Sequence, residues 1–296
     1  MGTKSYQFKV GAFDCLCVSD GSYDYPPETF VANIPTERFQ QELAEHALPT
    51  DHITSPYSSL LIDTGAHKVL IDTGAGFAPS NGHLLRNLQA EGIAPEAIDT
   101  VVLTHAHADH IGANIGPDGK PSFPNARYVI AKPEWDFWTQ EPNLSPMPDD
   151  DHLKHLLIAA VEQGLAPLQN HIDLIENEVE IVPGIYAVPA PGHTPGHMAL
   201  LISSGKEHLF HLADTVLHPI LMEHPDWHPR VDLIPDQALM TKRRLLDRAA
   251  VDRVPVFLYH VAPFPSLGQV IPHGNAWTWQ PVEPAGARAE DASATV

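Results

Sequence analysis

Three histidines and an aspartate lie within six residues, in the run Thr104-His105-Ala106-His107-Ala108-Asp109-His110. The run follows an apolar, β-branched segment, residues 100–103, which predicts a buried strand ending near Thr104. Open α/β sheets carry their chemistry at the carboxyl ends of strands. A loosely binding histidine tract would belong to a low-complexity segment, and this run does not. Imidazole and carboxylate groups delivered together at a strand end therefore indicate a metal site.

Three further candidate ligands occur at later predicted strand ends. His193 stands in a Pro/Gly-rich loop, residues 190–197, and Asp214 ends a predicted hairpin of residues 200–204 and 208–212. His260 follows a buried segment, residues 254–258. These candidates are separated by tens of residues, whereas zinc fingers use ligands in close pairs. We therefore expect a site assembled by the fold along one edge.

Sorted by ligand type, the candidates form two sites of three protein donors that share one carboxylate. Imidazole and carboxylate without thiolate suit zinc, manganese, iron or cobalt, and we expect two divalent ions, zinc first. Two ions about 3.5 to 4 Å apart can hold one hydroxide and polarise a carbonyl or phosphoryl oxygen, which predicts hydrolysis. Asp214 is the expected bridge. Asp109 is expected to serve the second metal and to hold or pass a proton.

Several other residues are candidates for supporting roles. Two copies of Leu-Ile-Asp-Thr-Gly, residues 61–65 and 70–74, predict a hairpin whose far end carries Asp72. His197 is expected to form hydrogen bonds within its loop, because the donors already named fill both sites. Trp138, His218 and Phe264 are candidates for the substrate pocket.

Composition limits the partners. The net charge of −20 repels phosphate backbones and anionic membranes, so we expect a small-molecule substrate, no nucleic acid and no membrane. The two cysteines, Cys15 and Cys17, should point to the same face of one strand, which disfavours a mutual disulfide. A chain without a disulfide framework fits a reducing compartment. No signal-peptide core or apolar run of membrane-spanning length is present, and we expect a cytoplasmic protein.

Strands alternate with helices in two similar halves, which predicts two sheets covered by helices on both outer sides. Residues 6–19 predict a first strand or strand pair, and residues 22–56 a surface excursion with one helical patch at 39–47. Ser80 is expected to cap a helix through Leu88, and residues 254–258 to form the final buried strand. The helix that begins at Pro235 should direct Lys242, Arg243 and Arg244 outward. Other predicted helices begin at Pro133 and His152.

The full ligand set resembles that of the metallo-β-lactamase superfamily: His105-x-His107-x-Asp109-His110, His193, Asp214 and His260. The likeness spans about residues 6 to 280. It implies an αββα sandwich of two mixed β-sheets flanked by helices, with His105, His107 and His193 on one metal and Asp109, His110 and His260 on the other. Asp72 matches an aspartate that supports the metal loop. We expect residues 1–283 to form a single domain and residues 284–296 a flexible tail.

Within that superfamily, the chain resembles the methyl parathion hydrolases and related quorum-quenching lactonases. The resemblance lies in residues 11–21, in His211-Leu212-Ala213-Asp214 and in Pro263-Phe264-Pro265. Val261 and Ala262 intervene after His260, and Ser266 replaces a glycine, departures that bear on the pocket. This branch implies hydrolysis of lactones, aryl esters or phosphotriesters, and a homodimer.

Other functions remain open from the sequence. An iron-dependent oxygenase of the persulfide dioxygenase type would use a similar motif with a single iron. A glyoxalase II-like thioesterase would need a basic glutathione site late in the chain. Arg288 is the only arginine or lysine after His260. A flavodiiron protein would carry Glu in place of His107. A nuclease branch would normally carry an extra domain, and a non-catalytic metal-binding module is the remaining alternative.

Overall fold

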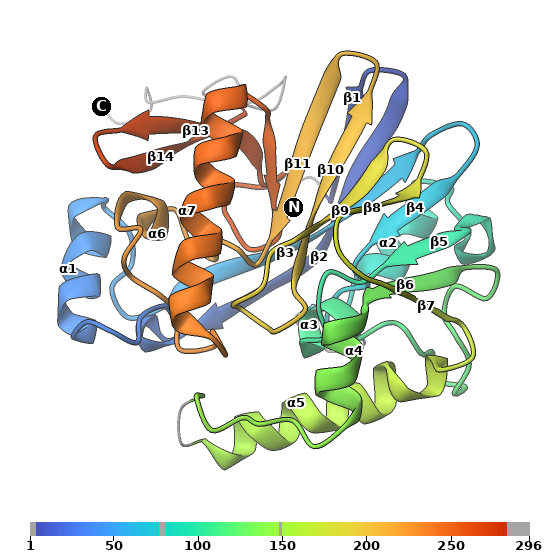
Figure 1. Ribbon diagram of the computed structural model, residues 1–296, viewed down its shortest axis with the longest axis horizontal. Helices are drawn as coiled ribbons and strands as arrows, with labels where there is room; N and C mark the ends of the chain where they lie inside the picture. Colours follow the sequence, from blue (N-terminus) through green and yellow to red (C-terminus); the bar gives the residue numbers. More distant parts are fainter. Residues whose placement is uncertain (1–3, 77–80, 148–149, 283–296) are drawn as a thin grey trace, which may run out of the picture.

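Two seven-stranded β-sheets form the centre of the molecule in the computed structural model, which describes residues 4–76, 81–147 and 150–282 (Figure 1). The first sheet has the spatial order β1 (Ser5–Val10), β2 (Phe13–Tyr25), β3 (Ile53–Asp63), β4 (Lys68–Ile71), β5 (Thr100–Val102), β6 (Arg127–Ala131) and β7 (Ile172–Ile175). The second has the order β14 (Ala276–Pro281), β13 (Leu267–His273), β12 (Val256–Leu258), β11 (Glu207–Ala213), β10 (Met198–Ser204), β9 (Ile185–Pro189) and β8 (Val179–Val182). In the first sheet the neighbours from β4 through β5 and β6 to β7 are parallel, and in the second sheet β11 and β12 are parallel. All other neighbouring strands are antiparallel, so both sheets are mixed.

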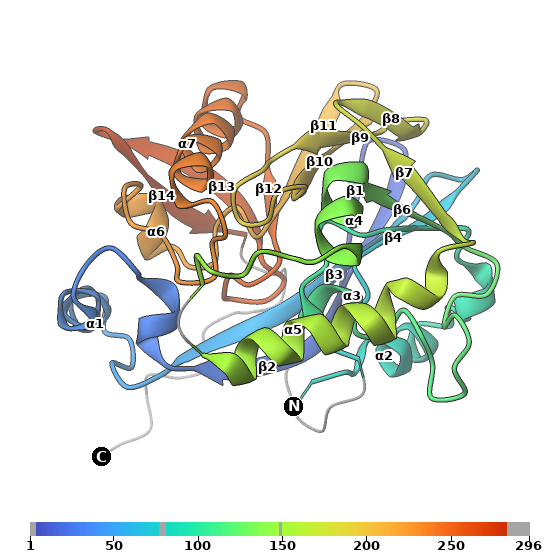
Figure 2. The same ribbon diagram turned by 60° about the horizontal axis from the view of Figure 1, so that its bottom comes forward.

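Helices cover the outer face of each sheet (Figure 2). The first sheet is covered by α2 (Leu84–Ala90), α3 (Ala108–Ile111), α4 (Lys132–Thr139) and α5 (Asp151–Gly164). The second is covered by α1 (Thr36–Glu45), α6 (Ile220–Glu223) and α7 (Pro235–Asp252). Short 3-10 helices span Pro27–Phe30, Pro95–Ala97 and Ala166–Leu168.

Buried apolar side chains fill three layers. Between the sheets, Leu60 and Ile71 of the first sheet join Ile202 and Phe257 of the second in one cluster. Two further clusters lie under the helices on either outer face. Removal of these side chains from water is the main stabilising contribution to such layers. The predicted αββα sandwich is confirmed.

The strand ends at one edge carry the candidate ligands. Asp72 follows β4, Thr104 lies just beyond β5, Asp214 follows β11 and His260 follows β12. The register shifts within the β11–β12 pair between His211 and Ala213, and such an irregularity changes the direction of the residues that follow it. Asp72 and Ala213 adopt φ of 60° and 45°, the left-handed region that strained, functional backbone often occupies.

The structure corrects the prediction for residues 22–56. β2 continues to Tyr25 and β3 begins at Ile53, so the intervening segment is shorter than expected. Phe30, Phe39 and Leu43 of this segment are buried in the cluster under α7. The segment is part of the core on that side, because its apolar side chains pack inward.

Two further predictions were wrong. Residues 254–258 do not form the last strand, because β13 and β14 follow and extend the second sheet. Lys242 does not point into solvent: it is 3% exposed, and its ammonium donates a hydrogen bond to the carbonyl of Trp227. Helical spacing placed Lys242 on the outer face of α7, but the segment around Trp227 covers that part of the helix.

Other local predictions agree with the structure. Cys15 and Cys17 are free and buried on β2, and residues 61–74 form the β3–β4 hairpin. The helix after Ser80 is α2, although Ser80 itself lies outside the described residues, as does the predicted tail at 284–296.

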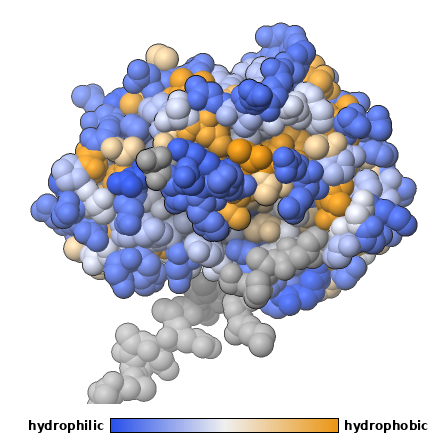
Figure 3. All heavy atoms as spheres, turned by 90° about the horizontal axis from the view of Figure 1, so that it is seen from below, coloured by the Kyte–Doolittle hydropathy of each residue, from blue (hydrophilic) through white to orange (hydrophobic). Residues whose placement is uncertain are grey.

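Hydrophilic side chains dominate the face seen from below, and apolar ones gather across its middle (Figure 3). Among the exposed apolar residues, Leu156 of α5 is 51% exposed, whereas Leu157 and Val161 of the same helix are buried. No helix within the described ranges is long and apolar enough to cross a membrane.

Candidate metal centre

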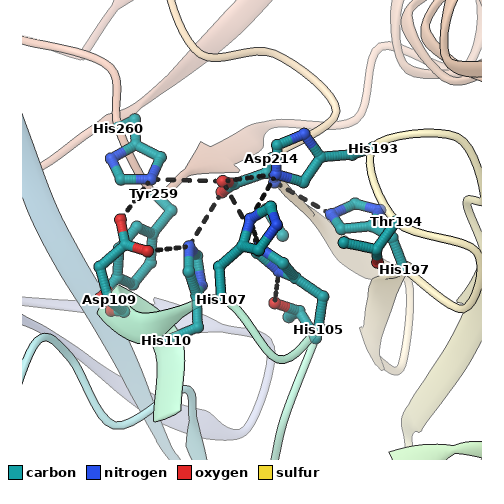
Figure 4. A network of polar contacts seen from close by, with 12 residues as sticks. His105, His107, Asp109, His110, His193, Thr194, His197, Asp214, Tyr259 and His260 are labelled. Carbon is teal, nitrogen blue, oxygen red and sulfur yellow. Dashed lines mark hydrogen bonds and ion pairs between the residues drawn. The ribbon is translucent and has the colours of Figure 1, made fainter. Parts of the chain in front are cut away.

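Two groups of ligand atoms converge at the shared edge of the sheets (Figure 4). The first donor group consists of His105, His107, His193 and Asp214, and the second of Asp109, His110 and His260. Within each group the ligand atoms lie within 4.8 Å of one another. All seven residues predicted as ligands therefore meet, although they come from four separate segments.

The loop that carries His105 to His110 is tied to the second sheet where it begins. The carbonyl of Thr104 accepts a hydrogen bond of 3.0 Å from the amide of Met198, which ties the loop to the second sheet. The one-turn helix α3 begins directly after His107, and the amide of His110 donates to the His107 carbonyl. Because of this short turn, His105 and His107 contribute to the first donor group while His110 contributes to the second.

Asp214 lies between the two groups. Its Oδ2 is 3.3 Å from His193 Nε2 and 3.3 Å from His260 Nε2. Its Oδ1 is 3.3 Å from His110 Nε2. Oδ2 thus faces histidines of both groups and Oδ1 faces the second group, so the carboxylate lies where it could bridge the two groups.

The Nδ1 atoms of four histidines face hydrogen-bond acceptors behind the site. His110 Nδ1 lies 2.8 Å from Asp72 Oδ2, and His193 Nδ1 lies 2.8 Å from Asp232 Oδ1. His105 Nδ1 lies 3.1 Å from the Thr104 hydroxyl, which itself donates to Asp72, and His260 Nδ1 lies near the Pro56 carbonyl and the Ser55 hydroxyl. A donated Nδ1–H leaves the Nε2 lone pair free, and outer partners of this kind orient metal-binding histidines.

His107 is arranged the other way round. Its Nδ1 lies 3.0 Å from both His105 Nε2 and His193 Nε2. Three imidazole nitrogens at such distances need a shared cation or proton, because their lone pairs repel one another. His110 Nε2 and Asp214 Oδ1 are also buried and, although 3.3 Å apart, neither has a hydrogen-bond partner of good geometry among the described residues. Such orphaned ligand atoms are rare, and the donor set fits two divalent metal ions.

The pKa values of the ligand histidines are shifted in two opposite directions. Burial, and then neighbouring histidines, lower the pKa of His105 and of His107 well below the ordinary value. Burial also opposes the charged form of His193 and His260, but Asp214 with Asp232 or Asp109 outweighs it and raises each pKa to about 9. Protons therefore compete for the inward nitrogens of these two residues, and metal binding must displace them.

The pKa of Asp214 lies well below its usual range. Burial alone would raise it, but His110, His260 and His105 together favour the ionised form. Asp109 follows the same pattern, with a pKa of about 2, because His110 and His260 outweigh its burial. Both carboxylates are therefore ionised at neutral pH and available as ligands.

His197 lies beside the centre but uses both ring nitrogens elsewhere. Its Nδ1 lies 2.9 Å from the carbonyl of Ala190, and its Nε2 accepts a hydrogen bond of 3.1 Å from the amide of Asp214. The ring thereby fixes the backbone of Asp214, in keeping with the hydrogen-bonding role expected for it.

Sequence reasoning missed three residues that hold the ligands in place. Asp232 contacts the imidazole of His193, and Ser55 contacts that of His260. The buried Glu134 accepts hydrogen bonds from the loop after β5 and from the loop that carries His193. Asp232 stands in a Pro-rich segment, Ser55 in a strand and Glu134 in the first turn of a helix. None carried a local signal, because each reaches its partner only through the fold.

The three predicted pocket residues lie in different surroundings. Trp138 is 3% exposed, and its ring lies 5.8 Å from that of His107, between centroids. His218 packs against Phe30 and Phe39, and burial lowers its pKa to about 4. Phe264 packs against the cluster between the sheets. Of the three, Trp138 lies beside the imidazole of a candidate ligand, and the pocket assignment stays a prediction.

Solved structures with the same fold include a lactonase and a further hydrolase. AidC, a dizinc quorum-quenching lactonase solved in complex with the product N-hexanoyl-L-homoserine, has 28% sequence identity, a TM-score of 0.89 and coverage of 94% of this chain and 97% of that one. The hydrolase AbOPH of the beta-lactamase superfamily has 25% identity and a TM-score of 0.87, over 96% of this chain and 99% of that one.

The sequence relatives agree in family. An N-acyl homoserine lactonase of Bacillus sp is 25% identical over 179 residues, which are 53% of this chain and 62% of that protein. The chain therefore matches less than two thirds of the length of this curated relative. Residues 53–260, which include every ligand candidate, match the family described as Metallo-beta-lactamase superfamily. The chain belongs to the metallo-beta-lactamase superfamily.

Proposed function

We propose that this chain is a dinuclear metal-dependent hydrolase whose substrates are lactones, with N-acyl homoserine lactones tested first. The observation that carries the proposal is the meeting of two donor groups at Asp214, with ligand atoms within 4.8 Å in each group. Relatives named as lactonases favour a lactone. Aryl esters and phosphotriesters are the competing substrate classes, because the chain also resembles the methyl parathion hydrolases.

We propose zinc as the metal in both positions. The donors are imidazoles and carboxylates, a set that zinc accepts readily, while manganese, iron and cobalt are the alternatives. Cys15 and Cys17 are buried away from the site in the core between the sheets. When bound, such a pair of ions supplies an activated water and polarises the oxygen of a carbonyl or phosphoryl group.

Asp109 is proposed to move the proton. Its side chain is 20% exposed, whereas the other members of the two donor groups are buried. Its own carbonyl accepts a hydrogen bond of 2.6 Å from the Tyr259 hydroxyl, which fixes its backbone. Because its pKa is low, the carboxylate is ionised before reaction. It can then accept a proton from water at Oδ1 or Oδ2 and return it to the leaving alkoxide.

A parallel assay tests the substrate class. Purified protein is given an N-acyl homoserine lactone, a nitrophenyl ester and a methyl phosphotriester under one buffer, and kcat/KM is compared. We expect the lactone to be turned over with the highest kcat/KM. A higher value for the phosphotriester or the ester would move the assignment to that class.

Metal analysis tests the chemistry independently of the substrate. We expect close to two transition-metal ions per chain, loss of hydrolysis on chelation and its return when zinc is restored. Full hydrolysis by protein shown to be free of metal would refute the proposal. One bound iron, with oxygen consumed in the presence of a thiol persulfide, would favour the oxygenase alternative.

Assembly and location are further proposals. A homodimer is proposed from the branch that the chain resembles, and sedimentation of the purified protein tests it. The charge of −20 supports a partner that is a small molecule rather than a nucleic acid or an anionic membrane. A cytoplasmic location is proposed as well, and fractionation of the source cells tests it.

A further inference from the structure

Glu134 is a fully buried carboxylate in the first turn of α4. Its Oε1 accepts hydrogen bonds from the amide of Ala106, at 2.9 Å, and from the indole of Trp138, at 2.8 Å. Its Oε2 accepts from the hydroxyl of Thr194, at 2.6 Å, and from the amide of Gly196, at 2.9 Å. Four neutral donors thus surround a carboxyl group that is closed to bulk solvent.

Three of the four donors, Ala106, Thr194 and Gly196, lie on the two loops that carry the histidines of the first donor group. Ala106 lies between His105 and His107, and Thr194 directly follows His193. One side chain is therefore bonded next to all three histidines of that group. Ala106 belongs to the same loop as Asp109 and His110, but none of the four hydrogen bonds reaches the short helix α3 that carries those two residues, or the segment that carries His260.

The contact between α4 and the His193 loop is close enough to depend on a glycine. A Cβ atom on Gly196 would lie 2.1 Å from the amide nitrogen of Glu134, so the loop and the helix backbone meet directly. A movement of Glu134 would therefore shift the loop. The indole of Trp138, which Glu134 also holds, lies beside the ring of His107.

The chemistry of the four bonds favours a carboxylate over an amide. An ionised carboxylate is purely an acceptor, with about four lone-pair directions, and bonds to it are stronger than bonds between neutral groups. A glutamine has the same shape but carries two N–H donors of its own. Its amide nitrogen would face either the Gly196 amide or the Ala106 amide, and neither can accept a hydrogen bond.

We infer that Glu134 is a positioning residue that holds the His105–His107 loop and the His193 loop at one spacing, and so sets the metal affinity of the first donor group. The inference rests on the proposed metal centre but not on the substrate. It requires that loss of Glu134 weaken the binding of one of the two ions and leave the binding of the other unchanged.

The test measures metal binding rather than hydrolysis. Wild type, Glu134→Gln and Ser55→Ala are stripped of metal and titrated with zinc against a chromophoric chelator, after circular dichroism has verified that each is folded. Ser55→Ala is the matched control, because its hydroxyl contacts His260 of the second donor group. For Glu134→Gln we expect one ion to bind about 10- to 100-fold more weakly, the usual effect of losing an outer partner.

Cobalt(II) identifies the affected group. Paramagnetically shifted imidazole N–H signals report which histidines carry an ion, and we expect Glu134→Gln to lose first those of His105 and His193. Ser55→Ala should weaken the signal of His260 instead. Two zinc affinities equal to those of wild type, or an equal loss from both groups, would overturn the inference. A wild type that binds fewer than two ions would overturn both this inference and the metal centre itself.

A second pair of variants covers the case in which Glu134→Gln does not fold. Thr194→Val removes one of the four bonds to the carboxylate, whereas Thr194→Ser keeps a hydroxyl in the same place. We expect the valine variant to bind the first ion several-fold more weakly than the serine variant. Equal zinc affinities in the two would contradict a positioning role for Glu134.

Discussion

Charged side chains lie behind His193 of the first donor group, whereas His260 of the second rests on neutral partners. His193 contacts the buried carboxylate of Asp232, and Lys242 interacts electrostatically with the same carboxylate from α7. His260 instead faces the hydroxyl of Ser55 and the carbonyl of Pro56. Asp72 serves both sides, because it holds His110 and also Thr104 beneath His105.

The difference predicts unequal affinities. A carboxylate behind an imidazole raises the basicity of the ligand, and a neutral carbonyl does so less. The first donor group is also nearly closed to solvent, whereas Asp109 of the second is partly exposed. We therefore expect the first ion to bind more tightly, and the second to lie nearer the substrate.

The largest effect should follow loss of a ligand. His107→Ala is expected to reduce hydrolysis to background and to release the first ion, because three nitrogens meet at His107 Nδ1. His260→Ala is expected to reduce hydrolysis equally but to keep one ion. Metal content by mass spectrometry separates the two variants. Retention of two ions by His107→Ala would break the comparison.

Asp72→Asn should weaken the binding of both ions. Asp72 accepts three hydrogen bonds of 2.8 Å, and asparagine tolerates its φ of 60° while losing part of this acceptor capacity. We expect about 10- to 100-fold weaker binding of each ion. The free energy of unfolding should fall by about 1 to 3 kcal/mol. Zinc titration and chemical denaturation measure these effects, and loss of a single ion would show that Asp72 serves one group only.

Lys242→Met tests the buried charge behind the first group. Burial lowers the pKa of Lys242 to about 8, so the unfolded chain binds more protons than the folded one between about pH 8 and 10.5. The free energy of unfolding of wild type should therefore rise across this window, relative to the variant, by about 3 kcal/mol. Denaturation at a series of pH values measures the difference. Parallel curves for the two proteins would contradict the assignment.

Asp232→Asn should have the smallest effect. Asparagine can still accept a hydrogen bond from His193 Nδ1 through its amide oxygen, but without the negative charge. We expect the first ion to bind about 10-fold more weakly, the lower end for a lost outer partner, while the second is unchanged. Stepwise zinc titration checks this result. A larger loss at the second ion would reverse the comparison between the groups.

Much of the site followed from local features of the chain. The β-branched segment before Thr104 and the histidine run after it predicted a strand and its metal-binding loop, and both lie where expected. The two copies of Leu-Ile-Asp-Thr-Gly likewise placed Asp72 at a strand end. These features are local because strand patterns and turn residues depend on near neighbours.

Predictions failed where a distant segment decides exposure. Lys242 has the sequence spacing of a solvent-facing residue, but the carbonyl of Trp227 covers it. Phe39 and Leu43 belong to a Pro-rich stretch that suggested a surface excursion, yet α7 and its neighbours enclose them. Burial depends on what packs against an element, which periodicity within that element does not contain.

The sequence by itself determined the kinds of ligand, their positions at strand ends and the fold that unites them. Only the tertiary structure decided which nitrogen of each histidine faces inward, and that Glu134 and Asp232 hold two of the loops. The physical reason is that an imidazole is oriented by the acceptor behind it. For His193 that acceptor lies 39 residues further along the chain, and it comes into contact only when the loop before α7 packs against the site.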